Sequence, residues 1–179
     1  MDISLINKTL ALGTIASQAF ILFSVLYVIF FRNSKILGFF EKNGIILAFL
    51  VSLSATLASL FYSNVAGFAP CDLCWIQRIF MYPLAFFFAI ALWKKNYSML
   101  NFAWGMSIIG FFISLYQNYL YYANSGLIAN CPFASAGVSC IKRYVFEFGY
   151  VTIPIMALTA FALIIVFLIL ARAHPNYNA

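Results

Sequence analysis

Pro70-Cys71-Asp72-Leu73-Cys74-Trp75 lies at the junction of two hydrophobic segments, the first ending at Pro70 and the second starting at Trp75. The chain therefore carries two closely spaced cysteines at a predicted membrane surface, where a helix begins. The N-terminus of a helix stabilises a thiolate, the form of cysteine that reacts in thiol–disulfide exchange. The pattern favours a redox-active pair of cysteines over a structural pair.

A second pair of cysteines, Cys131 and Cys140, follows two further apolar segments. Two membrane crossings return a chain to the side from which it started, so all four cysteines are predicted to face one compartment. This arrangement indicates a relay of disulfide exchange between two dithiol pairs.

The composition predicts an integral membrane protein. Of the 179 residues, 65% are hydrophobic and 8% are charged, which is too little polar surface for a soluble protein of this length. A helix needs about 20 apolar residues to cross a bilayer, so about five crossings take up nearly the whole chain. The basic residues behind the net charge of +6 lie scattered at the ends of apolar runs, so nucleic acid is not a predicted partner.

Each predicted span is helical, because backbone polar groups in lipid must be satisfied within the segment. The first span has no basic segment before it and no small-residue cleavage site, so we interpret it as a retained helix and not as a signal peptide. The five spans are predicted at residues 10–31, 44–61, 75–92, 100–121 and 148–170.

Basic residues orient the predicted helices in the membrane. One side carries Arg32, Lys35, Lys42, Lys94, Lys95 and Arg172, and the other carries Lys8, Lys142 and Arg143. The side with more basic residues is expected to be cytoplasmic, which places every cysteine outside the cytoplasm. Disulfides persist there, so the topology and the dithiol interpretation support each other.

Arg78 and Tyr82 follow Cys74 at intervals of four residues, so the three side chains share one face of a helix. A charge at the centre of a membrane helix costs roughly 2.5 to 3.5 kcal/mol, so Arg78 needs a partner. The expected partner is a cysteine thiolate, Asp72 or a bound electronegative ligand. Arg78 is then suited to stabilise the Cys74 thiolate and the charge that develops on a reduced quinone oxygen. The alternative is an arginine that extends to the lipid headgroups.

The cysteines leave two other interpretations open, structural disulfides and a zinc site. Zinc prefers closely spaced pairs, whereas eight residues separate Cys131 from Cys140 and the compartment is oxidising, so no metal is predicted. The second pair alone is typical of a structural disulfide. His174 is predicted to be a solvated tail residue, and Glu147 to begin the last span, capping it or pairing with Arg143.

Together these residues resemble the DsbB-type disulfide bond formation proteins, in particular their small BdbC-like branch. Within the all-α integral membrane fold, the resemblance implies a four-transmembrane-helix bundle at 44–171. The helix predicted at 10–31 departs from the family pattern as an additional N-terminal transmembrane helix. Residues 1–43 would hold that helix and a cytoplasmic loop, and residues 172–179 a cytoplasmic tail. The markers are Cys71-Asp72-Leu73-Cys74-Trp75-Ile76-Gln77-Arg78, the Cys131/Cys140 loop and Glu147-Phe148-Gly149-Tyr150-Val151-Thr152-Ile153-Pro154.

The resemblance implies an enzyme of the bacterial cytoplasmic (inner) membrane that reoxidises a DsbA-like thioredoxin-fold thiol oxidase. Its electrons would pass to the membrane quinone pool, either ubiquinone or menaquinone. Cys131 would form the mixed disulfide with the partner oxidase. Cys140 would pass the oxidising equivalent to Cys71, and Cys74 would face the quinone.

Three further residues belong to the predicted quinone site. Arg78 matches the arginine of the family that contacts the quinone head, and Gln77 occupies the neighbouring position of the motif. Tyr82 is added from its helical phase.

Two rival functions are open, of which the first is an enzyme and the second belongs to another class. A vitamin K epoxide reductase-like protein also couples loop cysteines to a membrane dithiol and a quinone, but there the loop pair precedes the dithiol, whereas here Cys71 and Cys74 come first. A non-enzymatic membrane scaffold or small transporter subunit with structural disulfides is the other rival. Arg78 is the one ionisable residue of the kind that a transporter would carry within its spans.

Overall fold

The computed structural model describes residues 3–30, 35–94, 98–123 and 144–172, and these residues form five long helices. All five are long and apolar enough to cross a membrane. The prediction of an all-α, multi-pass membrane protein is therefore confirmed. The helices are α1 (Ile3–Phe30), α2 (Lys35–Asn64), α3 (Asp72–Lys94), α4 (Met99–Ala123) and α5 (Ile153–Ala171).

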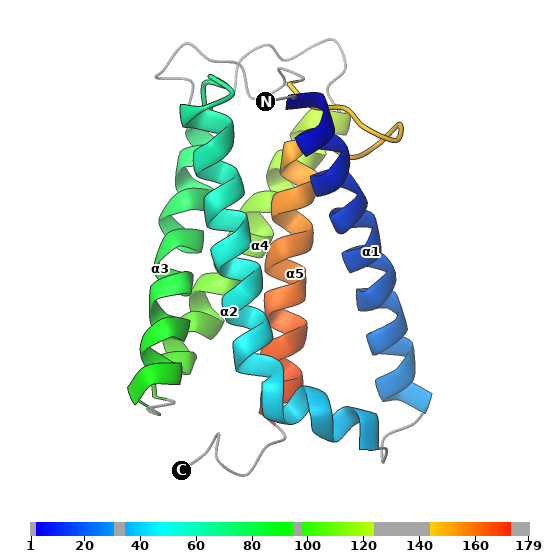
Figure 1. Cartoon of the computed structure of the whole chain (residues 1–179), viewed down its shortest axis with the longest axis vertical. Coiled ribbons are helices and arrows are strands. Elements are labelled where there is room, and N and C mark those ends of the chain that lie inside the picture. Colours follow the sequence, from blue (N-terminus) through cyan, green and yellow to red (C-terminus); the bar gives the residue numbers. More distant parts are fainter. Residues whose placement is uncertain (1–2, 31–34, 95–97, 124–143, 173–179) are drawn as a thin grey trace.

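Helices α2 to α5 form a bundle, and α1 lies at its edge (Figure 1). Within the bundle, α3 packs against α2 and α4, and α5 packs against the same two helices from the other side. The additional helix α1 is joined to the bundle through α5. The side chains of the core are fully buried; they include Leu84, Phe88, Phe161, Ile164 and Leu168.

Two glycines bring α5 close to its neighbours. A Cβ atom at Gly44 on α2 would lie 2.8 Å from the backbone oxygen of Phe167, and one at Gly110 on α4 would overlap the ring of Phe161. Helices in lipid associate mainly through van der Waals packing, which small residues permit by letting the backbones approach. These glycines therefore allow the core of the bundle to close around α5.

The described helices extend beyond the predicted spans at several ends. Helix α2 begins at Lys35 and not at residue 44, and its first part runs across the end of the bundle before the chain turns along the bundle axis (Figure 1). The apolar span within it starts at Lys42. Hydropathy marks the part of a helix that lies in lipid, and it does not register helical turns that continue beyond the membrane.

The last helix begins later than predicted, and the prediction that Glu147 starts it was wrong. Phe148 and Gly149 adopt positive φ angles of 51° and 80°, which turn the chain, and Glu147 pairs with Val151 across this turn. Helix α5 starts after Thr152, whose hydroxyl accepts a hydrogen bond from the backbone N–H of Ile155. The expected partner Arg143 lies outside the described residues.

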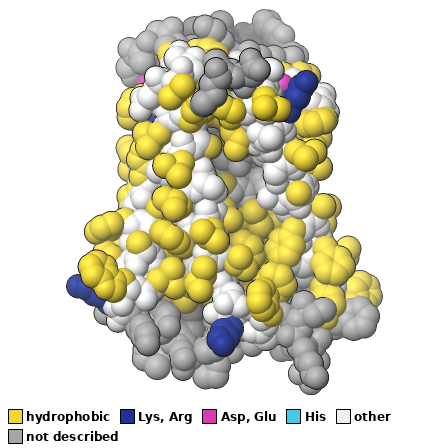
Figure 2. Space-filling view, in the orientation of Figure 1, with side chains coloured by type: hydrophobic (Ala, Val, Ile, Leu, Met, Phe, Trp, Pro, Cys, Tyr) yellow, Lys and Arg dark blue, Asp and Glu magenta, His cyan; other side chains and the backbone are white. Residues whose placement is uncertain are grey.

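The two ends of the bundle differ in charge. The start of α3 and the start of α1 lie at one end, and α5 finishes at the other (Figure 1). Hydrophobic side chains cover most of the visible flank, with Lys and Arg toward the ends (Figure 2). Lys42, Lys94 and Arg172 lie at the end opposite to the dithiol, and Lys8 lies at the dithiol end. The other basic residues of the orientation argument lack described side chains, and the cytoplasmic side and the domain limits at 43/44 and 171/172 remain predictions.

We predict that Gly110→Val lowers the free energy of unfolding by about 2 kcal/mol, because the new side chain displaces the Phe161 ring from the core. Thermal unfolding in detergent measures the effect. Gly105→Val is the matched control, because a Cβ atom at Gly105 on the same helix meets nothing within 4 Å. Equal melting temperatures for the two variants would contradict the packing described here.

Candidate active site

The dithiol lies at the first turn of α3. The helix begins at Asp72, and the backbone N–H of Trp75 donates to the carbonyl of Cys71 at 3.0 Å, which makes Cys71 the N-cap residue. Cys74 follows within the first turn. Their sulfur atoms are 3.1 Å apart, so small side-chain rotations bring them to the bonding distance of about 2.05 Å.

A glutamine from α4 contacts both sulfur atoms. Gln117 is 2% exposed, and its Nε2 lies 3.5 Å from the Cys71 sulfur and 3.3 Å from the Cys74 sulfur. The Nε2 of Gln77 donates to the Oε1 of Gln117 at 2.7 Å, which leaves the amide N–H groups of Gln117 directed at the dithiol. The pair of amides therefore presents a hydrogen-bond donor to whichever sulfur carries negative charge.

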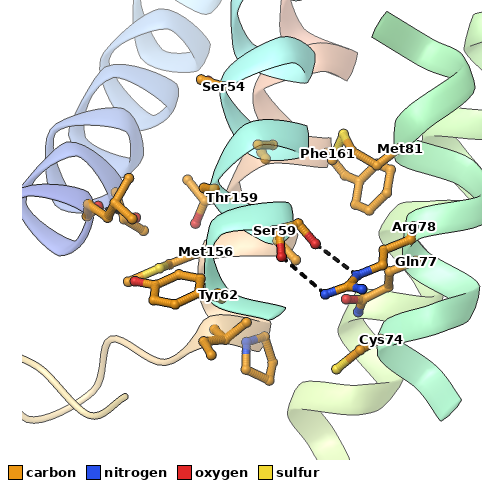
Figure 3. Close-up of a pocket in the computed structure, with 18 of the residues that line it drawn as sticks. Ser54, Ser59, Tyr62, Cys74, Gln77, Arg78, Met81, Met156, Thr159 and Phe161 are labelled. Carbon is orange, nitrogen blue, oxygen red and sulfur yellow. Dashed lines mark hydrogen bonds between the residues drawn. The ribbon is translucent and has the colours of Figure 1, made fainter. Parts of the chain in front are cut away.

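Arg78 is held by a neighbouring helix. Its Nε donates to the hydroxyl of Ser59 on α2 at 2.9 Å, and an Nη atom donates to the Ser59 carbonyl at 3.1 Å (Figure 3). The guanidinium also lies over the Trp75 ring, with Cζ 5.1 Å from the ring centroid. The sequence predicts a thiolate, Asp72 or a ligand as the partner of Arg78, and it does not single out Ser59, because it does not determine which helix packs beside α3. The structure directs the side chain across to α2.

One cavity of about 360 Å³ joins these groups. Cys71, Cys74 and Arg78 line it together with mostly apolar side chains from α2 and α5 and with small residues of α1 that include hydroxyl side chains. Tyr62 and Tyr82 also line it, and their hydroxyl groups are buried without a hydrogen-bond partner among the described residues. The cavity thus combines the dithiol, the positive charge of Arg78 and two tyrosine hydroxyls that bond to none of the described residues, within a mostly apolar lining.

The arrangement agrees with the comparisons with known proteins. The model of the family described as disulfide bond formation protein DsbB matches residues 41–171. The chain belongs to the DsbB family. It is similar to disulfide bond formation protein C of Bacillus subtilis (strain 168), at 41% identity over 138 residues, covering 75% of this chain and 99% of that protein. It is also similar to a probable disulfide formation protein of Metapseudomonas resinovorans, at 38% identity over 136 residues, covering 75% of this chain and 92% of that protein. No solved structure matches the chain significantly.

Membership of the DsbB family confirms the resemblance and the BdbC-like branch inferred from the sequence. It makes the chain a membrane-spanning disulfide oxidoreductase and favours this function over the vitamin K epoxide reductase-like and scaffold alternatives.

The structure brings five of the predicted site residues of this DsbB-family chain to one cavity, namely Cys71, Cys74, Gln77, Arg78 and Tyr82. The other two, Cys131 and Cys140, lie outside the described residues. The hydrogen bond to Gln117 gives Gln77 a second role, which is to orient another amide. That Arg78, Gln77 and Tyr82 bind a quinone remains a prediction.

Gln117 was not predicted, although the sequence contains a signal for it. Gln117 and Asn118 are adjacent amide residues in an otherwise apolar span. They lie close to its predicted outer end at residue 121 and thus at the depth of the dithiol. Asn118 donates to the carbonyls of Ser114 and Pro154, so its role is structural. Sequence alone does not separate the two roles.

We predict that Gln117→Leu makes the Cys71–Cys74 disulfide about tenfold harder to reduce, because the reduced form loses a hydrogen bond to thiolate worth roughly 1.5 kcal/mol. The measurement is equilibration with glutathione redox buffers followed by alkylation of free thiols, in a chain with serine at positions 131 and 140. Ser114→Ala is the control, since Ser114 is buried on the same helix and bonds to Gly110 instead of sulfur. If both variants show the same redox equilibrium, Gln117 does not stabilise the reduced dithiol.

Proposed function

We propose that this chain is a membrane thiol:quinone oxidoreductase that reoxidises a DsbA-like thioredoxin-fold thiol oxidase and so supports disulfide formation in exported proteins. Electrons pass from the partner through Cys131/Cys140 and then Cys71/Cys74 to a membrane quinone, ubiquinone or menaquinone. The observation that carries the proposal is a dithiol that opens, beside Arg78, into an apolar cavity within a DsbB-family bundle.

The residues of the cavity fit a quinone ring. A quinone has a flat apolar body and two oxygen atoms that accept hydrogen bonds. The guanidinium of Arg78 and the hydroxyls of Tyr62 and Tyr82, which bond to none of the described residues, are donors for such oxygens, and the remaining lining is mostly apolar. When bound, a quinone supplies an acceptor for the two electrons and two protons that a dithiol releases as it closes to a disulfide.

The chain's own residues prepare the dithiol for this reaction. The N-terminus of α3 and the N–H groups of Gln117 stabilise negative charge on Cys74. Ser59 fixes the Arg78 guanidinium before any ligand arrives, so its charge acts without reorganisation in a medium of low dielectric constant. The apolar walls exclude water, which strengthens these interactions.

The relay to the partner uses ordinary thiol–disulfide exchange. The partner's dithiol reduces the Cys131–Cys140 disulfide through a mixed disulfide at Cys131, and the loop thiols then reduce the Cys71–Cys74 disulfide. Each exchange forms one disulfide and breaks another, so electrons balance at every step. The basic residues at the opposite end of the bundle support an extracytoplasmic position for the cysteines in the bacterial inner membrane.

Cys74→Ser is predicted to abolish quinone reduction, because a single thiol cannot deliver two electrons by closing a disulfide. The assay is anaerobic quinone reduction by the purified protein in detergent, supplied with a reduced DsbA-type protein and followed by quinone absorbance. If the wild-type chain shows no turnover with ubiquinone or menaquinone and several thioredoxin-fold donors, the proposed function is wrong.

Arg78→Ala is predicted to raise the KM for quinone about tenfold, in keeping with the loss of a hydrogen bond from a charged donor, while the fold is retained. Ser59→Ala keeps the guanidinium and removes one of its two hydrogen bonds to Ser59, so its effect should be smaller and in the same direction. Steady-state kinetics against quinone concentration separates the two. An unchanged KM in Arg78→Ala would exclude Arg78 from the quinone site.

A further inference from the structure

Helix α1 forms one wall of the cavity that holds the dithiol. Five of its residues line the cavity, and they follow one another at alternating intervals of one and three positions along one side of the helix: Thr9, Leu10, Gly13, Thr14 and Ser17. The family match begins only at residue 41, so α1 lies outside it. The match with the Bacillus subtilis relative covers 99% of that protein and 75% of this chain. Part of this chain therefore has no counterpart there.

Specific contacts hold α1 against α5 and the turn that precedes it. The Nε2 of Gln18 donates to the hydroxyl of Thr159 at 3.1 Å, and the Tyr150 hydroxyl donates to the Oε1 of Gln18 at 2.8 Å. Below them, the rings of Phe20 and Phe167 meet with their centroids 5.7 Å apart. Since lipid offers no hydrogen bonds, the two bonds of Gln18 favour a docked helix over one surrounded by lipid.

Opposite this wall, α2 and α5 contribute small or flexible apolar side chains to the cavity, namely Ala55, Ala58, Met156, Ala157 and Ala160. This part of the cavity has no thiol or charged side chain. It is continuous with the part lined by Cys74 and Arg78. Tyr62, which is 5% exposed and whose hydroxyl has no partner among the described residues, lines the same cavity.

We propose that α1 is the outer wall of a groove that binds the isoprenoid tail of the quinone, a subsite that α1 adds to the bundle. This inference rests on the proposed function. A ring placed at Cys74 and Arg78 carries an apolar tail that must continue through the cavity toward lipid, and the lining of the cavity is mostly apolar. On α1, Leu10 and Gly13 present no polar side-chain atom, and the hydroxyls of Thr9 and Thr14 donate to carbonyls of their own helix. Helix α1 places protein atoms beside the tail, and these atoms add van der Waals contacts to it.

Gly13→Leu tests the proposal directly. A Cβ atom at Gly13 meets nothing within 4 Å, so a larger side chain enters the groove without disturbing the packing of helices. Gly105→Leu on α4 is the matched control, because Gly105 is equally open and does not line the cavity. Both variants exchange glycine for leucine on an exposed position of a membrane-spanning helix.

The readout is equilibrium binding to the purified full chain, followed through quenching of tryptophan fluorescence, with Trp75 next to Arg78 as the reporter. The probes are a quinone with a long isoprenoid tail and the same ring without a tail. Gly13→Leu should raise the Kd of the tailed quinone at least about tenfold, since about two buried methylene groups account for that difference, and leave the Kd of the tail-less ring unchanged. Gly105→Leu should change neither.

If Gly13→Leu raises the Kd of both probes equally, or changes neither Kd, the assignment of the groove to the tail is overturned. Gln18→Leu, which releases α1 from α5, should reproduce the tail-selective loss. If the wild-type chain binds neither probe, the proposed function fails together with this inference, whereas a tail-independent effect of Gly13→Leu refutes only the role of α1.

Discussion

Polar side chains inside the membrane must find their partners within the protein, and this chain places such pairs around the dithiol. Arg78 and Ser59 join α3 to α2, and Gln77 and Gln117 join α3 to α4. The side chain of Asn118 on α4 donates to the carbonyl of Pro154 and so joins α4 to α5. Each pair would be expensive to break in lipid, because a lost partner leaves a buried polar group unsatisfied. The same bonds that fix the helices therefore fix the groups around the sulfurs.

The remaining part of the bundle is held together differently. Gly44 and Gly110 let α5 approach α2 and α4, and rings and branched side chains fill the space without polar partners. This apolar packing stabilises the body of the bundle. The polar bonds determine the position of α3 at its first turn. Apolar packing thus holds the body of the bundle, and the polar bonds hold the helices together at the end that carries the dithiol.

Much of the fold and part of the site could be predicted from the sequence, for identifiable reasons. Long apolar runs mark membrane helices, and Pro70 beside Cys71 marks the start of one, so the dithiol at a helix N-terminus followed from local rules. The common face of Cys74, Arg78 and Tyr82 followed from helical periodicity. By contrast, Ser59 and Gln117 reach the site only through the packing of α2 and α4 beside α3, which no local pattern determines. Glu147 was misplaced because hydropathy does not register the left-handed turn at Phe148 and Gly149.

The position of the dithiol at the first turn of α3 meets two opposing demands of the proposed function. Exchange with protein disulfides needs sulfur atoms at the end of the bundle, where loops can reach them, whereas electron transfer to a lipid-soluble acceptor needs a dry, apolar cavity. A helix that starts at the membrane surface satisfies both, because Cys71 and Cys74 lie at its first turn, at the end of the bundle, and both line the cavity beside Arg78. Moving the pair one turn further along α3 would retain the cavity and lose the stabilising N-terminus. Moving it into the preceding loop would lose Gln117, Arg78 and the apolar walls together.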